Sequence, residues 1–233
     1  MVTISFLNLS IMLLPLAFVG FFYYRYTSDK KEIAYASLRM VLQLTLIGYV
    51  LIFIFKTKDL LIGSFILLFM LVFATFIILR VTKDKSLKNY MHIFIATFIS
   101  SFIHLFLIIV MVLDLDSLYE PRYVIPIVGM IFANSMNVIS LAIERFEKEL
   151  SRNESFKKAR EISFKASMIP QINSLLAVGL VALPGMMTGQ ILSGVDPLIA
   201  VRYQIMIMIM AISSGGMATI FYYILKSKII FKK

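Results

Sequence analysis

Seven long apolar runs constrain the fold of this chain more than any other feature of its sequence. They cover residues 4–24, 33–55, 60–79, 90–112, 123–143, 168–192 and 198–225. A helix needs roughly 20 apolar residues to cross a hydrocarbon layer about 30 Å thick, and each run meets that length. The runs lack the strict alternation of a membrane β-barrel. They therefore predict an all-α, polytopic membrane bundle of about seven transmembrane helices.

The composition supports a membrane protein because 60% of the 233 residues are hydrophobic and only 15% are charged. A soluble domain of this length could not bury so much apolar surface. No run of soluble sequence is long enough for a second domain, so we expect one transmembrane domain over residues 1–233. The chain contains no cysteine, which excludes a disulfide framework and thiolate metal sites. We expect a multi-pass protein of the cell (plasma) membrane.

Basic residues predict the orientation of the bundle. Eighteen of the 23 Lys and Arg residues lie in or beside the connections that follow the first, third, fifth and seventh runs. By the positive-inside rule, those connections are cytoplasmic, so the N-terminus lies outside and the C-terminus lies inside. The net charge of +10 then reflects topology and attraction to anionic lipid, and nucleic acid is not an expected partner.

The largest cytoplasmic segment covers residues 144–167. Its apolar residues recur at helical spacing, and Ser151-x-x-Glu154 fits a capping box that would separate two short amphipathic helices. We expect this segment to couple the chain to a cytoplasmic partner. Its candidate contact residues are Phe146, Leu150, Phe156 and Ile162. The alternative is a hairpin on the lipid surface that binds no partner.

Several kinds of chemistry are missing from the sequence. It has no P-loop motif, no nucleophile elbow and no metalloprotease motif. His92 and His104 would lie about 120° apart around one helix, so they cannot share a metal ion, and the metal ligands, if any, are unknown. No acidic residue lies at mid-membrane, where coupled carriers usually keep one. We therefore expect a chain that is not an enzyme, holds no cofactor, and draws energy from another subunit.

Polar and sulfur-bearing side chains in the fifth and sixth runs are the candidates for a substrate path. They are Asn134, Asn137, Gln190, Met186 and Met187. Amides within membrane helices face a water-filled path or hold neighbouring helices together, and both readings stay open here.

The same two runs contain helix-breaking residues that suggest a gate. These are Pro126 and Gly129 in the fifth run, and Pro184, Gly185 and Gly189 in the sixth. Pro184 should kink its helix, and Gly185-x-x-x-Gly189 is a close-packing pattern. At about 1.5 Å per residue, Gly129 and Gly185 come to a similar depth. The alternative is a static, close-packed interface.

Two segments carry a family resemblance. "VIPIVGMIFANSMN" (residues 124–137) and "VGLVALPGMMTGQILSGVDPLIAVRYQIMIM" (residues 178–208) closely resemble the permease subunit of the FetB (YbbM) family of ABC transporters. That family is implicated in bacterial iron export, with plant relatives implicated in aluminium tolerance. The resemblance implies a permease with a metal substrate, a separate cytoplasmic P-loop ATPase that binds the ATP, and a homodimer or higher oligomer. The alternatives are a stand-alone secondary carrier or channel and a non-transporting membrane scaffold.

Overall fold

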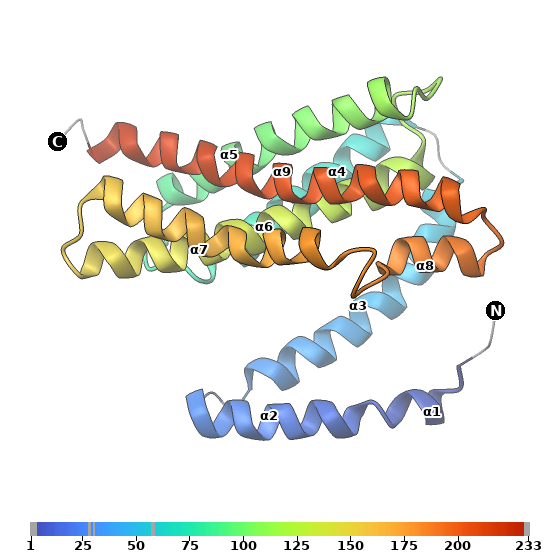
Figure 1. Ribbon diagram of the computed structural model, residues 1–233, viewed down its shortest axis with the longest axis horizontal. Coiled ribbons are helices and arrows are strands. Elements are labelled where there is room, and N and C mark those ends of the chain that lie inside the picture. The colour runs from blue at the N-terminus through green and yellow to red at the C-terminus, as the bar shows by residue number, and fades with distance from the viewer. Residues whose placement is uncertain (1–3, 28, 30, 57–58, 231–233) are drawn as a thin grey trace. The chain divides into compact units, whose positions relative to one another are not determined.

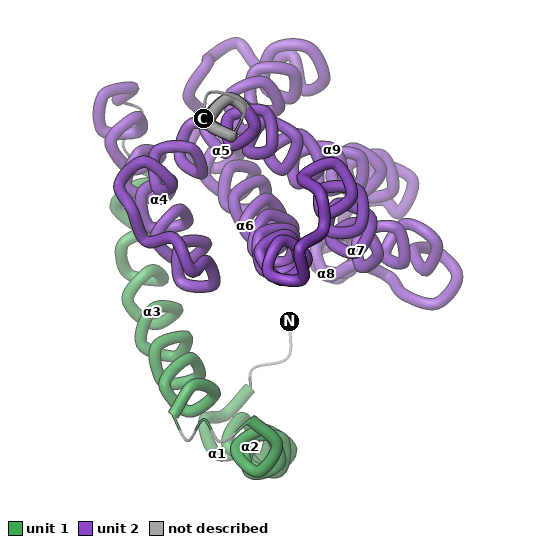
Figure 2. Tube along the Cα trace, turned by 90° about the vertical axis from the view of Figure 1, so that its left-hand side faces the viewer, with its two compact units in different colours: residues 1–57 green, residues 58–233 purple. Residues whose placement is uncertain are grey.

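The computed structural model describes residues 4–27, 29, 31–56 and 59–230, and every regular element within these ranges is a helix (Figure 1). Six helices in the described ranges are long and apolar enough to cross a membrane. The prediction of an all-α membrane bundle is confirmed, whereas the orientation of its ends stays a prediction. The chain divides into two compact units, residues 1–57 and 58–233, which Figure 2 colours separately.

The first unit consists of α1 (Phe6–Ser10), α2 (Leu13–Thr27) and α3 (Glu32–Ile54). Asp29 orders the start of α3, since its Oδ1 accepts hydrogen bonds from the amides of Lys31 at 3.0 Å and Glu32 at 3.1 Å. The Tyr23 hydroxyl donates to the Glu32 carboxylate, which joins α2 to α3. The spans Phe6–Thr27 and Glu32–Ile54 agree with the first two apolar runs.

The second unit is organised around its last helix. Its elements are α4 (Leu60–Leu79), α5 (Leu87–Phe106) with a π-helical extension η1 (Leu107–Val112), α6 (Pro121–Ser151), α7 (Phe156–Ala177), α8 (Gly185–Leu192) and α9 (Pro197–Ile230). Helix α9 packs against α5, α6, α7 and α8, and α4 packs against α5 and α6. In Figure 1, α7 and α8 together run alongside α9 in the opposite direction. Helix α9 is therefore the common partner of most of the unit.

Helices α6 and α7 form an antiparallel hairpin whose turn differs from the prediction. Helix α6 is continuous for 31 residues, so the first part of the segment predicted to be cytoplasmic is an extension of the fifth crossing and not a separate amphipathic helix. Ser151 is the last residue of α6, and its hydroxyl donates to the Lys148 carbonyl at 2.7 Å. The N-cap of α7 is Ser155, whose Oγ accepts from the Lys158 amide at 3.3 Å. The predicted capping box at Ser151 is therefore wrong.

The predicted sixth crossing, residues 168–192, is not one helix. Helix α7 begins twelve residues earlier than this run and ends at Ala177. A non-helical connection, residues 178–184, separates it from the short helix α8. The apolar run predicted a continuous helix because hydropathy does not register backbone conformation, and here Gly179 has φ of +83°. The crossing is interrupted within its apolar part.

Helix α9 approaches α6 closely at Gly215. A methyl group added at Gly215 would lie 2.6 Å from Cγ2 of Val138 and 3.4 Å from the Asn134 carbonyl oxygen. Added at Gly185 or Gly189, it would meet nothing within 4 Å among the described residues. A methyl group at Gly63 of α4 would likewise clash with the Tyr119 ring, so close-packing glycines lie in α4 and α9, whereas the predicted Gly185–Gly189 stripe has open space beside it among the described residues.

A polar cluster joins α9 to the α4–α5 connection. The Lys226 ammonium donates to Asp84 Oδ2 at 3.1 Å and to Asn89 Oδ1 at 3.0 Å, and Tyr222 Oη donates to the same Asn89 oxygen at 3.2 Å. Hydrogen bonds from Ser86, together with Lys226, lower the pKa of Asp84 to about 2. Because Asn89 is buried, these bonds satisfy an amide that would otherwise be costly to bury.

Replacing Gly215 should separate α6 from α9. Gly215→Ala places a methyl group against Val138, whose branched side chain has little rotamer freedom in a helix, so we expect a loss of about 1–3 kcal/mol in the free energy of unfolding. Gly216→Ala is the matched control, since its methyl group would lie 3.6 Å from the flexible Met168 terminus and should stabilise by up to about 1 kcal/mol. Unfolding in SDS titrations measures both, and equal effects would contradict the close approach.

Removing the Lys226 cation should loosen the polar cluster. We expect Lys226→Met to lower the free energy of unfolding by about 1–2 kcal/mol, because a partly buried ion pair and a hydrogen bond to a buried amide are lost. Lys158→Met removes an exposed ion pair with Glu161 and should cost less than about 0.5 kcal/mol.

The same cluster should contribute a stability that depends on pH. The pKa of the Asp84 carboxyl is lowered from 3.8 to about 2. The stability that the ionised carboxylate contributes is therefore complete above about pH 4 and is lost as the pH falls toward 2. Unfolding midpoints of wild type and Asp84→Asn, measured between pH 6 and pH 2, should therefore converge at the acid end. A constant difference over that interval would contradict the role of the ionised carboxylate.

Candidate functional site

The interruption between α7 and α8 is the most unusual backbone feature of the second unit. Val178 is extended, Gly179 adopts a left-handed conformation, and Pro184 is the N-cap of α8. Two hydrogen bonds close the connection, from the Ala182 amide to the Ala177 carbonyl at 3.1 Å and from the Gly179 amide to the Ala182 carbonyl at 3.0 Å. Pro184 does not kink a helix as predicted. It begins one, because its missing N–H is not needed at a helix start.

The interruption leaves backbone groups of both helices without their helical partners. The amides of Gly179 and Leu180 bond to Ala182 and Ala177, so the carbonyls of Leu175 and Leu176 lose the amides four residues ahead. The amides of the first turn of α8 also lack intrahelical acceptors, as at every helix start. The connection thus presents acceptors from one helix end and donors from the next. Interrupted helices of this kind bind ions and solutes in membrane transporters.

A cavity of about 350 Å³ lies between the interruption and α9. Pro184 and Met187 line it on one side, and Gln204 and Met208 of α9 line it on the other. Gln204 is only 6% exposed, and its Oε1 has no hydrogen-bond partner among the described residues. The cavity therefore combines an apolar lining and thioethers with one unsatisfied amide oxygen beside a helix break.

The structure brings only part of the predicted path together. Met187 lines the cavity. Met186 and Gln190 also lie on α8, where Met186 is exposed, Gln190 is half-buried, and Gln190 Oε1 is without a partner among the described residues. The two asparagines of α6 do not line the cavity. Asn134 donates to the Met130 carbonyl of its own helix at 2.8 Å, and Asn137 is exposed.

Only one of the two predicted gate elements is interrupted. Helix α6 continues through Pro126, and a methyl group added at Gly129 would lie 3.6 Å from the Met70 terminus, which is ordinary packing. In the other element, Pro184 borders the cavity, while Gly185 and Gly189 have open space beside them. The freedom that a gate requires is therefore confined to the α8 side.

The predicted coupling residues lie mainly inside the α6–α7 hairpin. The Phe146 ring is fully buried and packs edge-on against Phe156, with ring centroids 5.2 Å apart. Leu150 packs against the same core cluster, and Ile162 is half-buried. These residues hold the hairpin together, so a partner that docks on it would meet the charged outer faces of both helices first.

Sequence reasoning missed a row of buried polar residues on α5. Thr97, Ser100, Ser101 and His104 are all buried. His104 Nδ1 lies 2.7 Å from the Ser100 carbonyl, and its Nε2 lies 2.8 Å from Ser213 Oγ of α9. The spacing of the four residues places them on one helix face, which is the signal that could have identified the row.

In the described ranges no three His, Cys, Asp or Glu side chains are grouped to hold a metal ion.

Comparisons with known proteins give the relatives of this chain. The model of the "Uncharacterised protein family (UPF0014)" matches residues 6–231. The "Probable iron export permease protein FetB" of Escherichia coli is 32% identical over 82% of this chain and 78% of its own length. The "UPF0014 membrane protein YjkA" of Bacillus subtilis is 32% identical, over 82% and 81% of the two chains. The "Protein ALUMINUM SENSITIVE 3" of Arabidopsis thaliana is 31% identical, over 81% and 73%.

No solved structure matches the chain. The family match extends from the first helix to the end of α9, and it includes the interrupted crossing with the cavity beside it. With its bundle of membrane-spanning helices and relatives that are themselves named as membrane proteins and permeases, this chain belongs to the UPF0014 family of membrane proteins.

Proposed function

We propose that this chain is the transporting subunit of an ABC transporter that exports iron or a related metal. A separate cytoplasmic ATPase binds the ATP and supplies the work. Two or more copies of the chain form the complete permease. The relative named as a probable iron export permease supports the substrate class, and the absence of a P-loop from the sequence supports a motor on another chain.

The interrupted crossing is the observation that carries this proposal. Helix breaks are tolerated at membrane depth only where protein or a water-filled cavity covers the freed backbone groups. Here Leu175 at the end of α7 and Pro184 at the start of α8 line the cavity that Gln204 borders. A membrane scaffold has no use for such a break, whereas a transporter uses it to bind a solute and to change shape.

The chemistry of the cavity limits how a metal would travel. Among the described residues, its lining offers thioethers and an amide but no carboxylate, imidazole or thiolate. Hard metal ions prefer carboxylate and water oxygens, so this donor set suits a metal that passes within a complex better than a bare ion. The substrate is therefore proposed as a metal complex with an apolar exterior.

Transport by the purified chain with a co-expressed ATPase tests the proposal. In proteoliposomes we expect ATP-dependent movement of iron that requires both chains. Gly185→Leu, which fills the open space beside the cavity, should slow it roughly tenfold, the effect of a barrier raised by about 1.4 kcal/mol. Pro184→Ala should also slow transport, because it lets α8 extend backwards. Gly48→Leu in α3 is the matched control, since that glycine also has open space around it.

Three outcomes would contradict this function. Iron movement that persists without any ATPase would indicate a stand-alone carrier or channel. A stable complex without flux would indicate a scaffold. Normal transport by both Pro184→Ala and Gly185→Leu would remove the interrupted crossing from the mechanism, even if the ATPase were required.

A further inference from the structure

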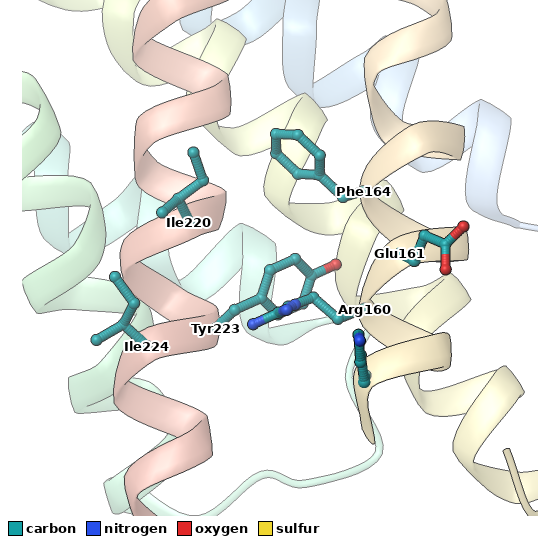
Figure 3. A pocket seen from close by; sticks show the side chains of 7 residues that line it. Arg160, Glu161, Phe164, Ile220, Tyr223 and Ile224 are labelled. Atoms are coloured by element: carbon teal, nitrogen blue, oxygen red, sulfur yellow. The ribbon is translucent and has the colours of Figure 1, made fainter. Parts of the chain in front are cut away.

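A second cavity, of about 430 Å³, lies between the first half of α7 and the last turns of α9. Figure 3 shows the side chains that line it. Arg160 projects from α7, and Ile220 and Ile224 project from α9. Lys157 of α7 also lines the cavity. This cavity is separate from the interrupted crossing, which lies at the other end of α7.

The α7 side of this cavity carries positive charge that the chain does not neutralise. Lys157 and Arg160 are one helical turn apart, and both are exposed. Among the described residues, neither forms an ion pair. Glu161 also lines the cavity, but its carboxylate pairs with Lys158 at 3.3 Å, and in Figure 3 it is directed away from α9. The two cations are therefore available to an anion.

The α9 side of the cavity is apolar and remains uncovered. Ile220 is 45% exposed and Ile224 is 46% exposed, although both lie in the span Pro197–Ser227, which is apolar enough to cross a membrane. Phe164 of α7 completes this surface. Behind it, the Tyr223 hydroxyl is already bonded to Ser163 Oγ at 2.6 Å. In the described part of the chain, the α9 side of the cavity is thus an apolar surface with no unsatisfied hydroxyl that would require a polar ligand.

The positions of the basic α7 side and the apolar α9 side relative to the membrane indicate which class of ligand the cavity would bind. Ile220 and Ile224 lie in the last turns of a crossing, while Lys157 and Arg160 lie in the first turns of α7, in the segment predicted to be cytoplasmic. Charge and apolar surface therefore meet at the boundary between hydrocarbon and water. Basic pockets between membrane helices on the cytoplasmic side bind anionic lipid headgroups. A guanidinium also matches the oxygens of a phosphate in a bidentate fashion.

We propose that this cavity binds an anionic phospholipid of the inner leaflet. Lys157 and Arg160 hold the headgroup phosphate, and an acyl chain lies along Phe164, Ile220 and Ile224. The bound lipid bridges α7 and α9 next to the α6–α7 hairpin. This site does not depend on the proposed transport function.

Native mass spectrometry of the full-length protein in detergent tests the site. Phosphatidylglycerol should bind in preference to phosphatidylcholine with the same acyl chains. Lys157→Gln/Arg160→Gln should weaken phosphatidylglycerol binding by about 30-fold, the contribution of two basic residues near a membrane surface. Lys148→Gln/Lys165→Gln removes the same charge from the α6–α7 hairpin outside the cavity and should weaken binding by less than about threefold.

Two further measurements separate a lipid from a free phosphate. Ile220→Ser/Ile224→Ser should weaken phosphatidylglycerol binding while both cations remain in place. Inorganic phosphate should not displace the lipid any better than sodium chloride at equal ionic strength. The site is contradicted if both lipids bind equally, if the control variant loses as much binding as the cavity variant, or if the serine variant binds normally. Displacement specific to phosphate would also contradict it, because it would indicate an anion site without an acyl-chain contact.

Discussion

Backbone groups inside a membrane must find hydrogen-bond partners within the protein. An interrupted crossing is therefore possible only where something satisfies the backbone groups that the break leaves unpaired. A continuous helix satisfies its own amides and carbonyls, which is why the described crossings are otherwise helical. Between α7 and α8 the chain departs from that solution, and Leu180 and Val181 stand 91% and 85% exposed beside the freed groups. A second chain or a water-filled path must cover them. The proposed transporting oligomer would supply both.

Packing within the second unit is uneven in a way that suits movement. Helices α5, α6 and α9 are held closely, through Gly215 against Val138 and through a hydrogen bond from Ser100 Oγ to the Ser214 carbonyl at 2.8 Å. Helix α8, by contrast, borders a cavity and has open space beside both of its predicted stripe glycines. Tightly packed cores resist continuous deformation, so a change of shape is cheapest at α8.

The sequence predicted the crossings well and the contacts between them poorly. The span Leu60–Leu79 was predicted to the residue because charged residues bound its apolar run. Gly185 and Gly215 look alike in sequence, yet only Gly215 meets a neighbouring helix, since periodicity does not reveal which face has a partner. Lys226 and Asp84 are 142 residues apart, and no local pattern connects them. Of the candidate site, Met187 and Pro184 were found because breakers and apolar runs leave local signals.

Helix α7 joins the two regions that a powered transporter has to connect. The sequence suggested a short cytoplasmic helix followed by a separate crossing, but the structure has one helix of 22 residues, about 33 Å long at 1.5 Å per residue. Its first turn packs in the hairpin core with Phe146, and its last residue opens the interruption. Pro170 removes one hydrogen bond within it and is the natural place for it to bend. In the proposed transporter, a displacement of the hairpin would reach the cavity beside α8 through this single element, with Pro170 as the point at which it can bend.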